Sequence, residues 1–160
     1  MRTIEINLYK YSELSGRAKQ KAKDWYCEGL DYYWWDDSLA SVKGFCNLFG
    51  VTVKDYSLGA FSPSWMTTDA DNHHFRGWGK KEIYALKDKS ITGYYTDWVL
   101  IDAMIELYTL NPDAKSAFNY AIDCAVKSIV NDWEYQYSEE AISEMMEANE
   151  YEFDEYGNRI

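Results

Sequence analysis

The chain has 160 residues, of which 47% are hydrophobic and 18% are aromatic. This is long and apolar enough for a packed domain, and it excludes an intrinsically disordered segment. The 27 acidic residues outnumber the 16 basic residues, so the net charge is -11. Phosphate groups repel such a chain, and we therefore expect no direct binding of nucleic acid.

The cysteines and the apolar runs indicate the cellular compartment of the protein. Cys27, Cys46 and Cys124 are odd in number and have no histidine or second cysteine at metal-ligand spacing. We expect all three to be reduced and metal-free, with Cys46 and Cys124 buried in helices. The first residues lack a signal peptide, and no apolar run approaches the ~20 residues of a membrane span. We therefore expect a soluble, intracellular protein without a membrane partner.

The first third of the chain predicts one strand and two helices. Residues 3–9 alternate polar and apolar side chains, as a half-buried strand does. Ser12 is the expected N-cap of a helix, whose apolar positions are Leu14, Ala18, Ala22, Trp25 and Gly29. Asp37 or Ser38 is expected to cap a second helix, with Gly50 at its left-handed C-terminal end. The buried positions of this second helix are Leu39, Val42, Phe45 or Cys46, and Phe49.

Strand patterns return in the middle third of the chain. Residues 51–56 resume the alternation, and residues 59–71 have the Pro, Ser, Thr and Asp content of a loop. Residues 74–78 and 82–86 are two further expected strands, of which the second could equally begin a short helix. Asp97 is expected to open a helix that buries one side, whose members are Trp98, Ile101, Ile105 and Tyr108.

The last third predicts two helices and an extended end. Residues 111–113, Asn-Pro-Asp, end one helix and start the next, whose apolar stripe is Phe118, Ile122, Ala125, Ile129 and Trp133. Ser138 is expected to cap a final helix with acidic residues in its first turn, and residues 151–158 follow as an extended segment. Together these elements predict one α+β domain spanning residues 1–160, with a small, mostly antiparallel sheet of three to four strands and about five helices.

The C-terminal segment, residues 131–160, carries most of the net charge. It has ten acidic residues and one basic residue, a charge of -9, whereas the other 130 residues carry -2. Glu140, Glu144 and Glu147 repeat at the spacing of one helical face. Three interpretations stay open: a solvated surface, a surface that binds a basic partner such as the nucleic-acid channel of a host enzyme, and a metal site.

Four consecutive aromatic residues, Tyr32, Tyr33, Trp34 and Trp35, lie between acidic residues. They cannot all face one core, because successive side chains of a helix or a strand point in different directions. Trp34 and Trp35 should therefore differ in burial. The run either packs the first two helices together or supplies Tyr and Trp anchors for a partner.

No residue pattern predicts catalysis, a cofactor or a metal ion. Asp69, Asp71, His73 and His74 form the one ligand-rich cluster, but a calcium loop would require Gly in place of His74 and Glu in place of Lys80. No nucleophile motif accompanies the histidines, and no glycine-rich phosphate loop is present. We expect a polar turn at this cluster, and a protein that is not an enzyme.

Several segments resemble small, uncharacterised proteins that bacteriophages, prophages and related mobile elements encode. The resemblance rests on residues 3–11, 13–15, 18–22, 31–36, 140–142 and 147–153. Relatives often carry a Gln-Gly-Asp-Gly stretch where this chain has residues 60–69, so no activity is carried over from that stretch. The resemblance implies an origin among phage accessory genes, which commonly encode acidic inhibitors of host defence such as anti-CRISPR and anti-restriction proteins.

The expected function is therefore inhibition of a bacterial defence system. The expected partner is a host defence protein or ribonucleoprotein with a basic groove, above all a CRISPR effector complex. The protein is expected to bind it stoichiometrically and to block its binding of nucleic acid. The expected partner-binding residues are Tyr32, Tyr33, Trp34, Trp35, Asp36, Asp37, Glu140, Glu144, Glu147, Glu150, Glu152, Asp154 and Glu155. The alternatives are an antitoxin-like or regulatory binding module and an enzyme of unrecognised type.

Overall fold

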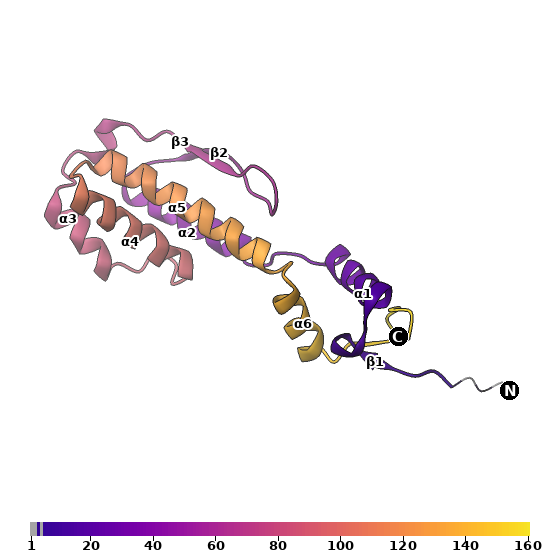
Figure 1. Ribbon diagram of the computed structural model, residues 1–160. Coiled ribbons are helices and arrows are strands. Elements are labelled where there is room, and N and C mark those ends of the chain that lie inside the picture. The colour runs from indigo at the N-terminus through magenta and orange to yellow at the C-terminus, as the bar shows by residue number, and fades with distance from the viewer. Residues whose placement is uncertain (1–2, 4) are drawn as a thin grey trace. The chain divides into compact units, whose positions relative to one another are not determined.

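The computed structural model describes residue 3 and residues 5–160 and has an α+β architecture (Figure 1). The described residues form six α-helices and four short strands. The strands form two separate antiparallel pairs. The predicted α+β class is confirmed, although the strands make two small sheets and not one sheet of three to four strands.

The chain groups into two compact units. The terminal unit comprises residues 1–32 and 134–160, and the central unit comprises residues 33–133. The length of 160 residues predicts one domain, because it is ordinary for a single domain. The division into two units depends on which side chains pack together. Length and composition do not indicate this packing.

The terminal unit packs two helices with a short strand pair. The helices are α1 (Gly16–Glu28) and α6 (Glu139–Ala148), and strand β1 (Tyr9–Lys10) pairs antiparallel with β4 (Glu152–Phe153). The buried core consists of Tyr11, Leu14, Ala22, Ile142, Met146 and Phe153. Because these residues come from both ends of the chain, the unit forms only when the N-terminal and C-terminal segments associate.

The central unit is mainly helical. Its elements are α2 (Trp35–Leu48), the hairpin of β2 (Val53–Ser57) and β3 (Trp65–Thr68), α3 (Lys80–Tyr84), α4 (Tyr95–Leu110) and α5 (Ala114–Tyr135), which begins here. Short 3-10 helices precede and follow α3 in the chain, at Asn72–Phe75 and Ala85–Asp88. None of the helices in the described part of the chain is both long and apolar enough to cross a membrane.

Phenylalanine rings make up much of the central core. The ring of Phe45 on α2 stacks on Phe118 of α5 with centroids 5.5 Å apart, and Phe49 meets both rings edge-on at 5.3 Å. The buried stripe predicted for α2 is confirmed, since all its members are buried: Leu39, Val42, Phe45, Cys46 and Phe49. Burial of such side chains is the main source of stability for the unit.

The predicted N-terminal strand is wrong for most of its length. Of residues 3–9, only Tyr9 belongs to a strand, and residues 5–8 are exposed. Ile4 lies outside the described residues. Alternation provides an apolar face but no neighbouring strand, and a strand needs both.

The predicted start of a helix is confirmed when a side chain caps that helix. The side chain of Ser138 accepts a hydrogen bond of 3.2 Å from the backbone N–H of Ala141, which confirms that cap. Ser12 is not a cap, because it lies in a 3-10 turn and the N-cap of α1 is Ser15. Helix α2 begins at Trp35, before either of the predicted caps.

The strand predicted at residues 74–78 is wrong, because this segment begins in a 3-10 helix. For residues 82–86 the second alternative, a short helix, is confirmed, since they lie in α3 and the 3-10 helix after it. The predicted loop at residues 59–71 contains β3. Phe75 and Ile83 lie in these helical segments and are buried. A short apolar run does not distinguish a buried helical turn from a buried strand, because both place apolar side chains in the core.

The three cysteines are free thiols, and we predict that they differ in reactivity. Cys46 is 1% exposed, and burial followed by the charge of Asp69 raises its pKa to about 12. Cys27 and Cys124 are only half-buried, so the burial predicted for Cys124 is partly wrong. We expect Cys46 to resist a thiol reagent in the native protein and to react only after unfolding. Rapid native labelling of Cys46, mapped by mass spectrometry, would contradict this expectation.

Candidate protein-binding surface

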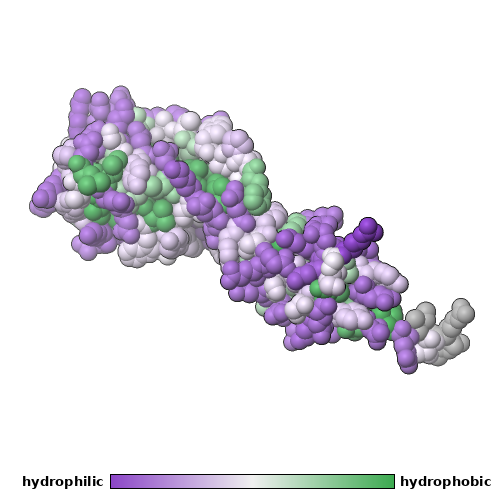
Figure 2. Space-filling model, viewed as in Figure 1, coloured by the Kyte–Doolittle hydropathy of each residue, from purple (hydrophilic) through white to green (hydrophobic). Residues whose placement is uncertain are grey.

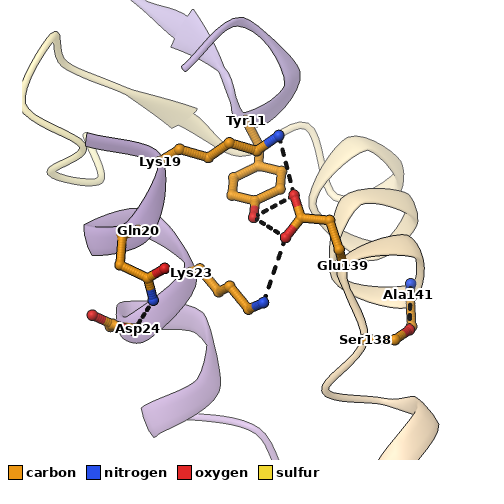
Figure 3. A network of polar contacts seen from close by, with 8 residues as sticks. All are labelled: Tyr11, Lys19, Gln20, Lys23, Asp24, Ser138, Glu139 and Ala141. Atoms are coloured by element: carbon orange, nitrogen blue, oxygen red, sulfur yellow. Dashed lines mark hydrogen bonds and ion pairs between the residues drawn. The ribbon is translucent and has the colours of Figure 1, made fainter. Parts of the chain in front are cut away.

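Glu139, the first residue of α6, joins the helices of the terminal unit (Figure 3). Its carboxylate accepts hydrogen bonds of 2.9 Å from the hydroxyl of Tyr11 and pairs with Lys19 at 3.1 Å and Lys23 at 3.5 Å. Burial acts to raise the pKa of Glu139, but hydrogen bonds from Lys19 and Tyr11 and the lysine charges outweigh it, so the pKa is lowered. This acid is therefore occupied within the unit.

Glu140, Glu144 and Glu147 form an acidic stripe along α6. Ile142 and Met146 are buried on the opposite side of this helix. At about 100° per residue, the three acids fall within one narrow face that points away from the core. All three side chains are exposed, as the spacing predicts.

The acidic surface continues beyond α6 through Glu150 and Glu152. The helix ends in a turn in which the N–H of Tyr151 donates to the carbonyl of Met146 at 3.0 Å. This turn places Glu150 at φ 53, in the left-handed region. Phe153 is buried in β4, so Glu152 beside it points outward and is exposed.

Asp154 and Glu155 differ in what they can offer a partner. The carboxylate of Asp154 accepts hydrogen bonds from the N–H groups of Tyr156 and Asn158, both at 2.9 Å, and from the Asn158 amide at 2.7 Å. The Asn158 amide is the main reason why the pKa of Asp154 is lowered. Asp154 thus closes the C-terminal turn, whereas Glu155 is exposed.

Four bases of the terminal unit are engaged by groups other than the acidic stripe. Lys19 and Lys23 pair with Glu139, Lys21 contacts Asn158, and Arg159 lies 4.4 Å from the ring centre of Tyr151. Among the described residues, no ion pair involves the carboxylates of Glu140, Glu144, Glu147, Glu150 or Glu152. Hydrophilic residues accordingly cover most of the visible surface of this unit (Figure 2).

A cavity of 370 Å³ lies beside the acidic stripe. It is lined by Lys10, Tyr11, Met146, Glu147, Glu150, Tyr151 and Glu152. Three carboxylates against one lysine make its wall negative, and two tyrosine rings and a thioether provide apolar contact. A long basic side chain of a partner matches both properties, because its stem is apolar and its end is charged.

The aromatic run predicted to bind a partner divides into buried and exposed residues. Tyr32 is only 2% exposed, so it is not part of a surface. Tyr33 and Trp34 are 74% and 54% exposed, whereas Trp35 is half-buried. The predicted difference between the two tryptophans is therefore confirmed. The negative end of this run, Asp36 and Asp37, is exposed and half-buried respectively.

The predicted site residues fall into both units. Tyr32 and the acids from Glu140 to Glu155 belong to the terminal unit, and residues 33–37 belong to the central unit. Within the terminal unit, the helical acids and the acids after them form one continuous stretch of chain. The acidic surface is thus defined by a single unit, and the aromatic residues are a separate feature.

The cluster at residues 69–74 is a polar turn. Asp69 accepts a hydrogen bond of 2.7 Å from the N–H of Thr52, and Asp71 accepts one of 2.8 Å from the N–H of Asn72. These backbone hydrogen bonds are the main reason why the pKa values of both acids are lowered. Within residues 3 and 5–160, no group of three His, Cys, Asp or Glu side chains has the geometry of a metal site.

Sequence reasoning missed an exposed aromatic group at the start of α4. Trp98 is expected on the buried side of this helix, yet it is 56% exposed, next to Tyr94 and Tyr95 at 44% and 75%. The inward side begins instead with Asp97, which is 4% exposed and precedes the buried Leu100. The sequence offered one indication of this arrangement, since Asp97 lies at helical spacing from the buried apolar positions of α4. An Asp near a helix start is ordinarily an exposed cap, so this indication was not followed.

Comparison of the chain with models of known protein families, with curated proteins and with solved structures finds no significant match.

Proposed function

We propose that this protein is a binding protein and not an enzyme, and that its acidic surface occupies the basic nucleic-acid groove of a host defence complex. The expected target is a CRISPR effector complex in the cytoplasm of the host cell, which the protein blocks stoichiometrically. Support for a phage origin comes from the resemblance of residues 3–11 and 147–153 to phage-encoded proteins.

The observation that carries the proposal is the unneutralised charge of the terminal unit. Glu139 is held by two lysines, but the acids from Glu140 to Glu152 have no ion-pair partner among the described residues. Exposed charges of one sign raise the rate at which a partner of opposite sign is found, by tenfold or more. A groove that binds nucleic acid is a partner of this kind, because it is lined by Lys and Arg.

Tyr33 and Trp34, which belong to the central unit, supply a separate apolar contact with the same partner. Both rings are exposed, and Tyr and Trp are the residue types that most often dominate binding energy at interfaces. The acids would then set the rate of association and the rings the lifetime of the complex. This division of roles follows the usual behaviour of rim charges and buried anchors.

Neutralising the stripe should slow association. We expect Glu140→Gln/Glu144→Gln/Glu147→Gln to lower the on-rate for a purified CRISPR effector complex by at least about tenfold. Because these side chains are exposed, the melting temperature should stay unchanged. Biolayer interferometry gives the on-rate, and the wild-type rate should fall as salt rises, since exposed charges are screened beyond ~8 Å at physiological ionic strength.

A second triple variant controls for net charge. Asp102→Asn/Glu106→Gln/Asp123→Asn removes the same three charges from exposed positions of α4 and α5. It should leave the on-rate within about twofold of wild type. An equal loss in both variants would mean that only total charge matters. Failure of the wild-type protein to compete with nucleic acid for any effector complex would refute the proposed function.

A further inference from the structure

The cavity of 370 Å³ beside the acidic stripe combines an aromatic floor with a charged rim. The floor is buried or half-buried and consists of Tyr11, Met146 and Tyr151. The rim is exposed and consists of Lys10, Glu147, Glu150 and Glu152. The volume falls within the ~300–1,000 Å³ of typical ligand-binding cavities. The cavity is therefore large enough for one long side chain of a partner.

The rim of this cavity selects a positive charge. Three glutamates against one lysine give the lining a charge of -2. None of the ion pairs among the described residues involves these four side chains. Lys19, a further base close to Tyr11, pairs with the carboxylate of Glu139 at 3.1 Å. A cation that enters the cavity therefore meets an excess of unneutralised carboxylates.

Both tyrosine rings of the floor already contact a cation of this chain. The Nζ atom of Lys19 lies 4.9 Å from the ring centre of Tyr11, and the guanidinium carbon of Arg159 lies 4.4 Å from the ring centre of Tyr151. Both distances are within the ~6 Å of a cation–π contact. Neither base belongs to the cavity lining. The two rings are thus electron-rich surfaces with which this fold binds cations.

The floor favours arginine over lysine. The rings of Tyr151 and Trp25 are nearly perpendicular, with centroids 5.4 Å apart, and this packing fixes the orientation of the Tyr151 ring. A guanidinium group is flat, so it can stack on such a ring and still donate two parallel hydrogen bonds to a carboxylate. An ammonium group is a compact, strongly hydrated charge without a flat face. The buried Met146 offers apolar contact to the stem of the side chain.

We propose that this cavity binds one arginine side chain of the partner. The guanidinium group lies on the ring of Tyr151 and donates hydrogen bonds to the carboxylates of the rim. The inference rests on the proposed function, because the arginine is one that lines the nucleic-acid groove. Such grooves use arginine to bind phosphate in the same bidentate way. The cavity therefore adds one specific contact to the general attraction between the acidic surface and the groove, and this contact slows dissociation.

Titration of the full chain with N-acetyl-arginine N-methylamide, followed by NMR, tests the cavity without a partner protein. We expect saturable shifts at the methyl group of Met146 and at the backbone N–H of Tyr151. N-acetyl-lysine N-methylamide should bind at least about fivefold more weakly, and the uncharged N-acetyl-citrulline N-methylamide should give no saturable shift. Equal affinity for the lysine probe would overturn the assignment to arginine, and so would the absence of saturable shifts with the arginine probe.

Two double variants locate the binding. Glu147→Gln/Glu150→Gln removes two charges from the rim and should weaken binding of the arginine probe by at least about fivefold. Asp102→Asn/Glu106→Gln removes two charges from exposed positions of α4 and should change this binding by less than about twofold. All four side chains are exposed, so both variants should keep the melting temperature of wild type. Equal weakening in both variants would show that net charge attracts the probe, and would overturn the proposal.

Dissociation from a purified CRISPR effector complex separates this inference from the proposed function. We expect Glu147→Gln/Glu150→Gln to raise the off-rate by at least about fivefold. An effector complex that binds wild type and this variant with the same off-rate would overturn the cavity proposal and leave the proposed function in place. If the arginine probe binds as expected but wild type binds no effector complex, the proposed function fails, whereas the assignment of the cavity to arginine holds.

Discussion

Replacing Asp97 by Ala should lower the free energy of unfolding of the central unit by about 3–4 kcal/mol. The substitution removes the acceptor of three backbone N–H groups and of the Thr92 hydroxyl at a position that is 4% exposed. Hydrogen bonds to a charged group contribute about 1.5–3 kcal/mol each, and buried donors without an acceptor add a desolvation cost. The four bonds share one carboxylate, so their loss is smaller than their sum.

Urea unfolding followed by circular dichroism measures this change. Asp102→Ala on the exposed side of α4 is the control and should change stability by less than about 0.5 kcal/mol. Asp97→Asn keeps one carbonyl acceptor, so its free energy of unfolding should fall between those of Asp97→Ala and Asp102→Ala. Equal stability of Asp97→Ala and Asp102→Ala would mean that the loop at residues 91–93 does not depend on the carboxylate of Asp97.

The contribution of Asp97 should also depend on pH. Burial acts to raise its pKa, but the hydrogen bonds from Thr92 and Gly93 outweigh burial, so the pKa in the folded protein is lowered. Its stabilisation is therefore complete above the unfolded value of ~3.9 and is lost as the pH falls through the folded value. Between pH 5 and about pH 2, wild type should lose more stability than Asp97→Ala does.

Gly157→Ala should destabilise the terminal unit by about 3 kcal/mol and release the C-terminal turn. A Cβ atom at Gly157 would lie 2.0 Å from the carbonyl oxygen of Ala18 on α1, so backbone must move. The residue also has φ +81, where alanine is strained. Overpacking costs about 1–3 kcal/mol and left-handed backbone about 1–2 kcal/mol, which together give the expected size.

Gly77→Ala separates these two contributions. Gly77 has φ +82, but an added Cβ would meet no atom within 4 Å, so only the backbone strain applies there. It should cost about 1–2 kcal/mol, clearly less than Gly157→Ala. Hydrogen exchange of residues 152–160 should rise in Gly157→Ala alone. Protection that stays at the wild-type level would show that the turn tolerates a side chain against α1.

The local features of this protein were readable from its sequence. The cap at Ser138, the break at residues 111–113 and the left-handed Gly50 at the end of α2 are set by neighbouring residues. The acidic stripe of α6 was predicted for the same reason, because the 3.6-residue repeat fixes which side chains share a face. The sequence by itself therefore determined the long helices and the exposure of Glu140, Glu144 and Glu147.

Tertiary structure alone decided which residues are free to act. Tyr11 and Glu139 are 128 positions apart and yet share a hydrogen bond, which engages the carboxylate of Glu139 within the terminal unit. Trp98 is exposed because the fold buries Asp97 beside it, against the ordinary behaviour of both residue types. Of the strand predicted at residues 3–9, only Tyr9 pairs with β4, because the other described residues of that span have no neighbouring strand. Burial and pairing depend on partners distant in the chain, and neither composition nor periodicity identifies those partners.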